Sequence, residues 1–362
     1  MNIEELAEAG TSVWLDDLSR RKLSGTDNHS LPHRIAEDGV VGVTTNPSIF
    51  LMAIKGSEDY VVDISQMAGA SADDVVRKLT TDDVRSACDL FAPLYVSSRG
   101  VDGRVSIEVD PRLAHQTQAT IEEGKLLYNL VDRRNVLIKV PATLEGLPAI
   151  TALIAQGISV NVTLIFSLTR YAEVIDAFML GLEQRLGSSL PLDEIHSVAS
   201  FFISRIDTAV DAELRELGNS ELLGKAAIAN ARLAYELYES KCASDRWANL
   251  SRHGAHMQRP LWASTGVKDP NYEDTRYVLE LVAPNTVNTM PQSTLDALLD
   301  HGIFKGNTIQ GRYEDARSDM LALNSLGISL DKISYELEVD GVKRFADGWI
   351  SLLESVSAVI PK

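Results

Sequence analysis

A lysine interrupts an apolar run near the middle of the chain, in the stretch VLIKVPATLEG at residues 136–146. Burial favours the neutral amine of a lysine over its ammonium, and a neutral amine is a nucleophile that can form a Schiff base with a carbonyl compound. An isolated lysine in such a run can equally reach solvent with its charged end or pair with a carboxylate. Lys139 is therefore a candidate nucleophile whose role depends on the groups around it.

Polar residues also interrupt or close the other apolar runs of the chain. They are Asp16 and Asp17 in VWLDDL, Thr44 and Asn46 in VVGVTTN, Glu108 in RVSIEV, Asn161 and Thr163 in ISVNVTLIF, and Ser200 in SVASFFI. Glu108 is either half of a buried ion pair or an acid/base group whose pKa is raised by burial. Because successive strand residues face opposite sides, only one of Asp16 and Asp17 is expected to point inward. So many polar residues in different runs predict one shared polar centre.

The apolar runs themselves predict strands that alternate with helices. The eight runs span 13–18, 40–46, 104–109, 135–140, 158–166, 197–203, 260–265 and 286–290. Most are apolar at both alternating positions, which is typical of strands covered on both faces in a parallel sheet. Amphipathic segments at 112–131 and 147–157 lie between runs, and Gly157 ends the second as a helix cap would. This order favours an α/β fold, either a (β/α)8 TIM barrel or a doubly wound sheet.

Two observations favour the TIM barrel with additional helices. No run is followed by the glycine-rich fingerprint of a dinucleotide-binding, doubly wound sheet. The segments 50–103 and 207–259 are longer than a bare connection requires, and the tail after Pro291 has a helical pattern. No linker, charge block or repeat divides the chain, so we expect residues 1–362 to form a single (β/α)8 barrel domain with N-terminal, inserted and C-terminal helices. Catalytic groups of such barrels stand at the C-terminal ends of strands, where the polar residues occur.

Composition limits the partners and the compartment. The 362 residues contain 34 Lys and Arg against 51 Asp and Glu, which gives a formal net charge of −17. Such an acidic surface repels nucleic acid and anionic membranes, so neither is an expected partner, and an anionic substrate would need local cations. Cys88 and Cys242 are the only cysteines, and neither a signal segment nor a membrane-length apolar run is present. We therefore expect a cytoplasmic protein.

Other common chemistries find little support in the sequence. It contains no H-E-x-x-H, Walker A or G-x-S-x-G motif, and no paired His/Asp spacing typical of a metal site. The seven histidines, among them His115 and His196, are scattered. Lysine chemistry without a metal is left as the leading hypothesis.

Two of these motifs resemble the sequence signatures of transaldolases. They are GVTTNPS at 42–48 and VLIKVPATLEG, the more specific of the two because it contains the lysine. VWLDDLSR, VSIEVDPRLA, VNVTLIFS, SFFISRID and RPLWAST also fall in family order, so the resemblance covers nearly the whole chain and is closest to the longer bacterial branch. It implies phosphorylated sugar substrates, neither metal nor organic cofactor, and a class I aldolase-type barrel of the non-oxidative pentose phosphate pathway. Such a barrel transfers a dihydroxyacetone unit from sedoheptulose 7-phosphate or fructose 6-phosphate to glyceraldehyde 3-phosphate or erythrose 4-phosphate.

The resemblance also implies roles for individual residues. Lys139 matches the Schiff-base lysine, and Asp16 matches the acid/base aspartate that takes the proton of the C4 hydroxyl. Glu108 and Thr163 match the pair that holds a catalytic water for dehydration of the carbinolamine. The residues that match positions binding the sugar hydroxyls are Thr44, Asn46, Asn161 and Ser200.

The phosphate site implied by the resemblance is only partly matched. Arg205 in FFISRID matches the phosphate arginine, whose planar fork suits bidentate contact with phosphate oxygens. Shorter family members carry a second arginine after the seventh strand, in a serine-aromatic-arginine sequence, whereas this chain has ASTGVKDP. Ser264 fits that sequence, the arginine is missing, and Lys268 is our candidate for the substitute cation.

Two alternative functions stay open at this point. A fructose 6-phosphate aldolase-like lyase shares the barrel and the lysine, but its chains are shorter and we associate it with tyrosine or glutamine in place of the acid or water-holding groups. Asp16 and Glu108 are both present here. A non-catalytic sugar-phosphate binding barrel would not need Lys139 for chemistry. The sequence does not rank the substrates, explain the additional helices, or decide between a monomer and a homodimer.

Overall fold

The centre of the molecule is a closed barrel of eight parallel strands, arranged in the order in which they occur along the chain. The computed structural model describes residues 3–361. The strands are β1 (Thr11–Leu15), β2 (Gly42–Val43), β3 (Arg104–Glu108), β4 (Val136–Pro141), β5 (Val160–Ile165), β6 (Ser197–Phe202), β7 (Arg259–Ala263) and β8 (Thr286–Met290). Every residue of β3 to β6 is buried, as expected for strands covered on both faces. The eight predicted strands and the (β/α)8 fold class are confirmed.

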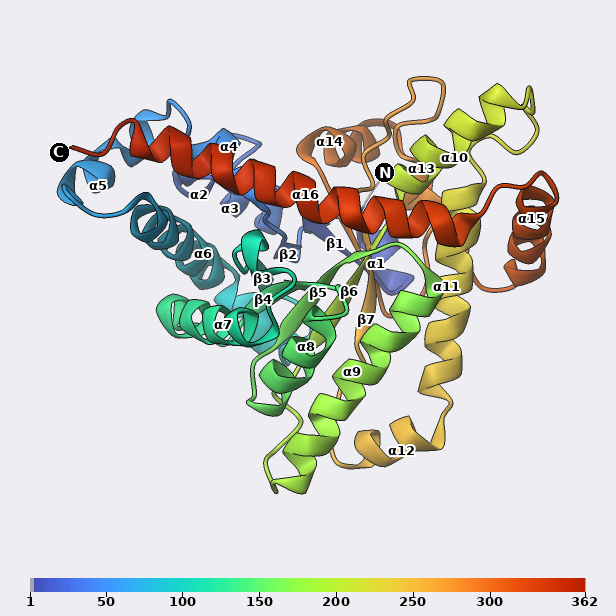
Figure 1. The fold of residues 1–362 in the computed structure, drawn as a ribbon, viewed down its shortest axis with the longest axis horizontal. Coiled ribbons are helices and arrows are strands. Elements are labelled where there is room, and N and C mark those ends of the chain that lie inside the picture. The colour runs from blue at the N-terminus through green and yellow to red at the C-terminus, as the bar shows by residue number, and fades with distance from the viewer. Residues whose placement is uncertain (1–2, 362) are drawn as a thin grey trace.

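Helices connect the strands and cover the outside of the barrel (Figure 1). They are α1 (Glu4–Glu8), α2 (Arg20–Ser24), α3 (Leu31–Ala36), α4 (Pro47–Ile54), α5 (Val61–Gln66), α6 (Ala72–Ser97), α7 (Thr117–Val131), α8 (Gly146–Ala155), α9 (Leu168–Gly187), α10 (Ser204–Glu216), α11 (Ala226–Cys242), α12 (Asp245–Arg252), α13 (Arg276–Leu279), α14 (Gln292–His301), α15 (Tyr313–Ser325) and α16 (Leu330–Ser357), with 3-10 turns η1 (Glu58–Tyr60) and η2 (Pro111–Leu113). The long segments 50–103 and 207–259 and the tail after Pro291 are helical, as predicted. Gly157 follows α8 with φ +91°, as a helix-ending glycine does.

Two strands end earlier than the predicted runs. β1 ends at Leu15, so Asp16 is the first residue of the following loop, although its backbone N–H still donates to the Met290 carbonyl at 2.8 Å. β2 contains only Gly42 and Val43, and Thr44 and Asn46 follow it. Asn46 cannot continue the strand because it caps α4, its side-chain oxygen accepting from the Ile49 N–H at 3.1 Å. These polar residues therefore lie on βα loops rather than inside strands.

The turn after β4 explains why a glycine follows the lysine in VLIKVPATLEG. A side chain at Gly146 would approach the Pro141 carbonyl oxygen to 2.1 Å, so only glycine fits. The Thr143 hydroxyl accepts from the Gly146 N–H at 3.0 Å and donates to the Ala114 carbonyl at 2.5 Å. These contacts fix a tight turn between β4 and α8, immediately beyond Lys139.

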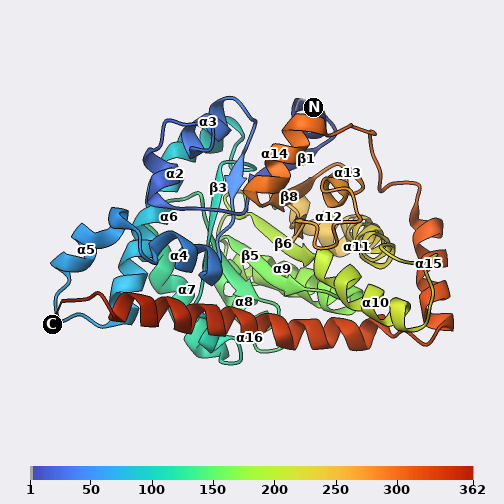
Figure 2. The ribbon, with the colours of Figure 1, turned by 90° about the horizontal axis from the view of Figure 1, so that it is seen from above.

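The C-terminal helix α16 lies across the carboxyl end of the barrel (Figure 1). Figure 2 shows it extending from α15, past the barrel, to the neighbourhood of α5. It contacts α4, α6, α10 and β5. At Gly341 a side chain would meet Leu164 Cδ2 at 2.9 Å, and Leu164 itself has φ +60° at an irregularity in the pairing of β5 with β6. The absence of a side chain at Gly341 thus lets α16 pack directly on the end of β5.

Cys88 is buried, Cys242 is half-buried, and both are free thiols. Of the helices within residues 3–361, none has the length and apolar character needed to cross a bilayer.

Candidate active site

Lys139 lies near the carboxyl end of β4, in register with Glu108 on one neighbouring strand and Asn161 on the other. Its side chain is 5% exposed, and Nζ lies 3.3 Å from Glu108 Oε2. Nζ also donates a hydrogen bond to the Thr45 carbonyl at 3.0 Å. The amine is therefore buried inside the barrel beside one carboxylate, and the lysine does not extend to solvent.

Glu108 is as deeply buried as its partner, with 5% of its side chain exposed. Burial raises the pKa of Glu108 to about 7, an effect that the Lys139 ammonium opposes and the Asp16 carboxylate reinforces. Proton transfer from the ammonium to this carboxylate produces the neutral amine that nucleophilic attack requires. A carboxyl group with a pKa near neutrality can both accept and return that proton.

Two buried oxygen atoms beside Lys139 have room for a further partner: Thr163 Oγ1 makes no hydrogen bond within residues 3–361, and Glu108 Oε2 has the ion pair with Lys139 but no closer hydrogen bond within the same residues. Thr163 lies on β5, and its strand partner is Pro141, two residues after Lys139 on β4. Buried polar atoms normally have partners, so two such atoms in one place indicate a position for water or a substrate hydroxyl. A carboxylate and a hydroxyl on either side can hold a water molecule near the amine.

The two aspartates after β1 have different surroundings. Asp16 points into the barrel, where it accepts a hydrogen bond from the Thr44 hydroxyl at 2.6 Å. Burial raises the pKa of Asp16, while Lys139 and Thr44 oppose the shift. Asp17 points away and forms an ion pair with Lys22 at 3.1 Å, with 31% of its side chain exposed. Of the two, Asp16 is thus the one that faces the amine.

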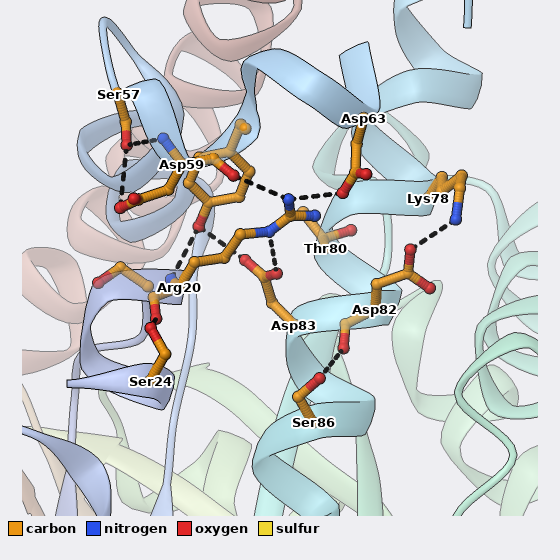
Figure 3. A network of polar contacts seen from close by, with 12 residues as sticks. Arg20, Ser24, Ser57, Asp59, Asp63, Lys78, Thr80, Asp82, Asp83 and Ser86 are labelled. Carbon is orange, nitrogen blue, oxygen red and sulfur yellow. Dashed lines mark hydrogen bonds and ion pairs between the residues drawn. The ribbon is translucent and has the colours of Figure 1, made fainter. Parts of the chain in front are cut away.

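A polar network around Arg20, four residues after Asp16, links the start of α2 to α6 (Figure 3). Arg20, at the start of α2, donates from Nε to Asp83 of α6 at 3.0 Å and pairs with Asp63 at 2.5 Å. Its guanidinium also lies 4.4 Å from the centre of the Tyr60 ring, whose hydroxyl donates to Asp83 at 2.7 Å. Because Asp83 is only 2% exposed, this network is shielded from solvent. It anchors the loop after β1 to a long helix and limits the movement of Asp16.

The amide and hydroxyl residues of the predicted site are linked to one another. The Ser200 hydroxyl donates to Asn161 Oδ1 at 2.7 Å, and Asn161 Nδ2 donates to the Ser106 hydroxyl at 3.0 Å. Thr44 is also within 2.6 Å of the Thr289 hydroxyl. These bonds fix the orientation of the side chains before any substrate arrives. Pre-oriented donors and acceptors suit the recognition of several sugar hydroxyls.

A cation-lined end of the site lies at the start of α10. Arg205 Nη1 is buried and makes no hydrogen bond with any residue from 3 to 361. Burial lowers the pKa of Arg205, and the Arg344 guanidinium adds to this while Asp340 opposes it. The Ser264 and Ser204 hydroxyls lie 3.0 Å apart at the same end. A buried arginine with a free donor is the expected contact for a phosphate group.

Lys268 lies at the same end and lines the same cavity as Arg205 and Ser264. Gly266, two residues after Ser264, stands where the resemblance places an arginine. Lys268 Nζ is 3.7 Å from the position that a side-chain carbon at 266 would take. The lysine amine therefore reaches back over Gly266 and brings a second cation to the cavity.

One cavity of about 150 Å³ joins these groups. Of the eleven predicted site residues, it is lined by nine: Asp16, Thr44, Asn46, Lys139, Thr163, Ser200, Arg205, Ser264 and Lys268. The other two, Glu108 and Asn161, contact Lys139 and Ser200. An adjoining cavity of about 310 Å³, lined by Asp207, Asp211 and Lys268 among others, is larger. We place the chemistry in the smaller cavity because it contains the buried amine.

The structure adds residues that sequence reasoning missed. Phe345 of α16 lines the cavity, and its ring centre is 5.5 Å from Lys139 Nζ. Phe202, at the end of β6, lies under the Arg205 guanidinium at 5.2 Å. Phe202 was visible in the strand pattern as a position near the end of an apolar run. Phe345 gave no signal, because it is one apolar residue among many in a helix and lies more than 200 residues after Lys139 in the sequence. Its ring shields the amine from solvent.

Comparison with known proteins gives one consistent result. A family model described as Transaldolase/Fructose-6-phosphate aldolase matches residues 13–356. The match begins in β1 and ends in α16, so it includes every strand of the barrel and the helix across its mouth.

Curated relatives match over almost their whole length. A protein named Transaldolase 1 from Streptomyces avermitilis is 55% identical over 361 residues, which are 98% of this chain and 95% of that protein. Proteins named Transaldolase from Arthrobacter sp. and Renibacterium salmoninarum are 55% and 56% identical, cover 99% and 98% of this chain, and are themselves covered to 97% and 96%.

Proposed function

This chain belongs to the transaldolase and fructose-6-phosphate aldolase family and has transaldolase activity, and from this premise we propose that Lys139 is the amine that forms the Schiff base. The observation that carries the proposal is the buried contact between Lys139 and Glu108, with Nζ 3.3 Å from Oε2. The donor is sedoheptulose 7-phosphate or fructose 6-phosphate, and the acceptor is glyceraldehyde 3-phosphate or erythrose 4-phosphate. The reaction requires neither a metal nor an organic cofactor.

Imine formation begins with proton transfer from the Lys139 ammonium to the Glu108 carboxylate. The free amine attacks C2 of the ketose, and a proton of the attacking nitrogen moves to the carbonyl oxygen, which becomes the hydroxyl of a carbinolamine. A water held between Glu108 and Thr163 then relays the proton from Glu108 to that hydroxyl, which leaves as water. The nitrogen lone pair forms the protonated imine, and the carboxylate is restored.

Carbon–carbon cleavage then depends on Asp16. Its carboxylate removes the proton of the C4 hydroxyl, the C3–C4 bond breaks, and the bond electrons move into the protonated imine to give an enamine. The aldose product leaves, and the enamine carbon attacks the carbonyl carbon of the acceptor while Asp16 returns the proton. Burial favours protonated Asp16 after cleavage, so the proton is held for the second half of the reaction.

The remaining residues bind the substrate. Thr44, Asn46, Asn161 and Ser200 hydrogen-bond the sugar hydroxyls, and Arg205, Ser264 and Lys268 bind the phosphate. Asn46 contributes its amide NH₂, because its side-chain oxygen already caps α4. Phe345 and the rest of α16 restrict water at the enamine, which favours transfer to an aldehyde over hydrolysis.

A single assay distinguishes transfer from simple cleavage. With fructose 6-phosphate alone, we expect at most one equivalent of glyceraldehyde 3-phosphate per site and no steady release of dihydroxyacetone. Turnover should begin when erythrose 4-phosphate is added. Steady release of dihydroxyacetone without an acceptor would favour the aldolase-like lyase and contradict the proposal.

Arg205→Ala should chiefly raise KM for phosphorylated donors, by about 10- to 100-fold, because hydrogen bonds to charged groups contribute about 1.5–3 kcal/mol. The rate with unphosphorylated fructose should change little, since that donor makes no phosphate contact. Initial rates over a concentration series of each donor provide the measurement. Arg317→Ala on α15, which removes an exposed arginine paired with Glu236 and Glu314, is the matched control. An unchanged KM in Arg205→Ala would place the phosphate elsewhere.

We also propose that residues 1–362 form one domain and that the protein acts in the cytoplasm. Nucleic acid and membranes are not expected partners, because the formal net charge is −17. For the oligomeric state we propose a monomer or a homodimer.

A further inference from the structure

A second polar cavity, of about 270 Å³, lies at the opposite end of the barrel. It is lined by the first residues of strands, Arg104 of β3, Ser197 of β6 and Arg259 of β7, which places it at the amino end. The proposed reaction uses none of these residues. We call this cavity the basal pocket and define it by Arg104, His196, Ser197, Trp247, His256 and Arg259.

Arg104 is a buried cation without a carboxylate partner. It is 1% exposed, and its Nε and Nη1 donate to the carbonyls of Gly100 at 2.7 Å and Arg134 at 3.2 Å. Nη2 has no hydrogen-bond partner, and Arg104 forms no ion pair with any acidic residue from 3 to 361. Burial lowers the pKa of Arg104 to about 10. A buried charge without a counterion is costly, so an anion in the basal pocket would stabilise this guanidinium.

Arg259 supplies a second free donor to the same pocket. Its Nη1 pairs with Asp102 at 3.1 Å, and its Nη2 donates to the Ser12 hydroxyl at 2.6 Å. Its Nε is buried and has no partner among the described residues. The ion pair fixes the guanidinium in place and leaves Nε–H available. Two buried N–H groups from different strands thus lack acceptors beside one cavity.

His196 adds a polar group to the same pocket. Its ring stacks on His256, with centroids 4.4 Å apart, and His256 Nε2 is 3.1 Å from the Asp193 carbonyl. Burial, with Arg104 nearby, lowers the pKa of His196 to about 2, so the ring is neutral and can donate one N–H. A methyl group at Gly100 would lie 3.0 Å from His196 Nε2 and 3.1 Å from Arg104 Nη2. The two nitrogens therefore border the same space.

We propose that the basal pocket binds a small phosphate-type oxyanion, held by Arg104 Nη2, Arg259 Nε and the His196 ring. Guanidinium and imidazole N–H groups are the usual donors to phosphate oxygens. The cavity is slightly smaller than the roughly 300–1,000 Å³ of drug-sized sites, which suits inorganic phosphate or the phosphate of a small monoester. The proposal does not depend on the catalytic assignments.

Calorimetric titration with inorganic phosphate tests the proposal, in parallel with glycerol 2-phosphate as a small monoester. The titration uses the Arg205→Ala protein, because this substitution weakens phosphate binding at the proposed active site. One saturable site should remain, and Arg104→Gln on this background should weaken it about 10- to 100-fold, the range for hydrogen bonds to charged groups. Arg134→Gln is the matched control: its side chain is exposed outside the pocket, and binding should not change. Tighter binding of one probe identifies free phosphate or a monoester as the ligand type.

A second variant keeps the test valid if Arg104→Gln does not fold. His196→Gln should weaken phosphate binding several-fold, and phosphate should shift the ring resonances of His196 and His256 in the NMR spectrum of the Arg205→Ala protein. No saturable binding, or binding that both variants leave unchanged, would overturn the proposal. Two equal sites in Arg205→Ala would instead contradict the active-site role of Arg205. The Arg104→Gln result would still show whether the basal pocket binds phosphate.

Discussion

Lys139→Ala should abolish turnover and remove covalent trapping of substrate. In the wild-type protein, borohydride added with fructose 6-phosphate should reduce the imine and leave a three-carbon adduct on Lys139, which intact-protein mass spectrometry detects. Alanine cannot form the imine. The protonated imine that accepts the electrons of the C3–C4 bond is therefore lost as well. We expect no adduct and a rate at the assay background.

The contacts of Lys139 predict that the Lys139→Ala protein still folds. Removing the ammonium leaves Glu108 buried without its cation, so its pKa should rise further and the carboxyl group should stay neutral. The fold should therefore tolerate the change, which circular dichroism checks. Lys22→Ala is the matched control, because Lys22 is a nearby lysine paired with Asp17 and should leave both trapping and turnover intact. An unchanged wild-type mass after borohydride would support the non-catalytic binding barrel instead.

The barrel and most of its site could be predicted from the sequence because both depend on local patterns. Apolar runs of strand length identify the eight strands, and the end of each run indicates the catalytic face. Asp16, Glu108 and Lys139 each lie near the end of a different run, so the closure of the barrel brings them together without further information. The resemblance to transaldolases then supplied the roles, which periodicity alone left ambiguous for Lys139.

The rest of the site depends on contacts between distant segments. Phe345 reaches Lys139 only because α16 crosses the barrel mouth, and that path depends on the close approach of Gly341 to Leu164. The sequence also did not show that the Asn46 side chain caps α4 in addition to lining the site. Arg104 looked like an ordinary first residue of a strand in the sequence. Its lack of a carboxylate partner appears only when its neighbours in space are known.

Glu108→Gln should slow imine formation by about 10² to 10⁴-fold, the usual range for a general acid/base group. Glutamine keeps the size and polarity of the side chain but cannot accept the proton of the Lys139 ammonium or return it to the carbinolamine. Stopped-flow measurement of imine formation with excess fructose 6-phosphate gives the rate. Glu123→Gln on α7 is the matched control, because burial also raises the pKa of Glu123 but its partner is Arg77, outside the site. A wild-type rate in Glu108→Gln would remove the proton-transfer role.

The pH dependence of this step has a defined direction. With a pKa of about 7, Glu108 is mostly ionised above pH 7 and can accept the ammonium proton; below pH 7 it is increasingly protonated and cannot. The wild-type rate of imine formation should therefore fall as the pH drops from 8 to 6, with a midpoint near 7. Lys139 and Asp16 are the charged groups that set this midpoint, the first lowering and the second raising the pKa of Glu108. In Glu108→Gln the fall in the rate between pH 8 and pH 6 should disappear, leaving a slow rate without a midpoint near 7. A midpoint that persists in the variant would assign the titration to another group, and Asp16 would then be the group to replace next.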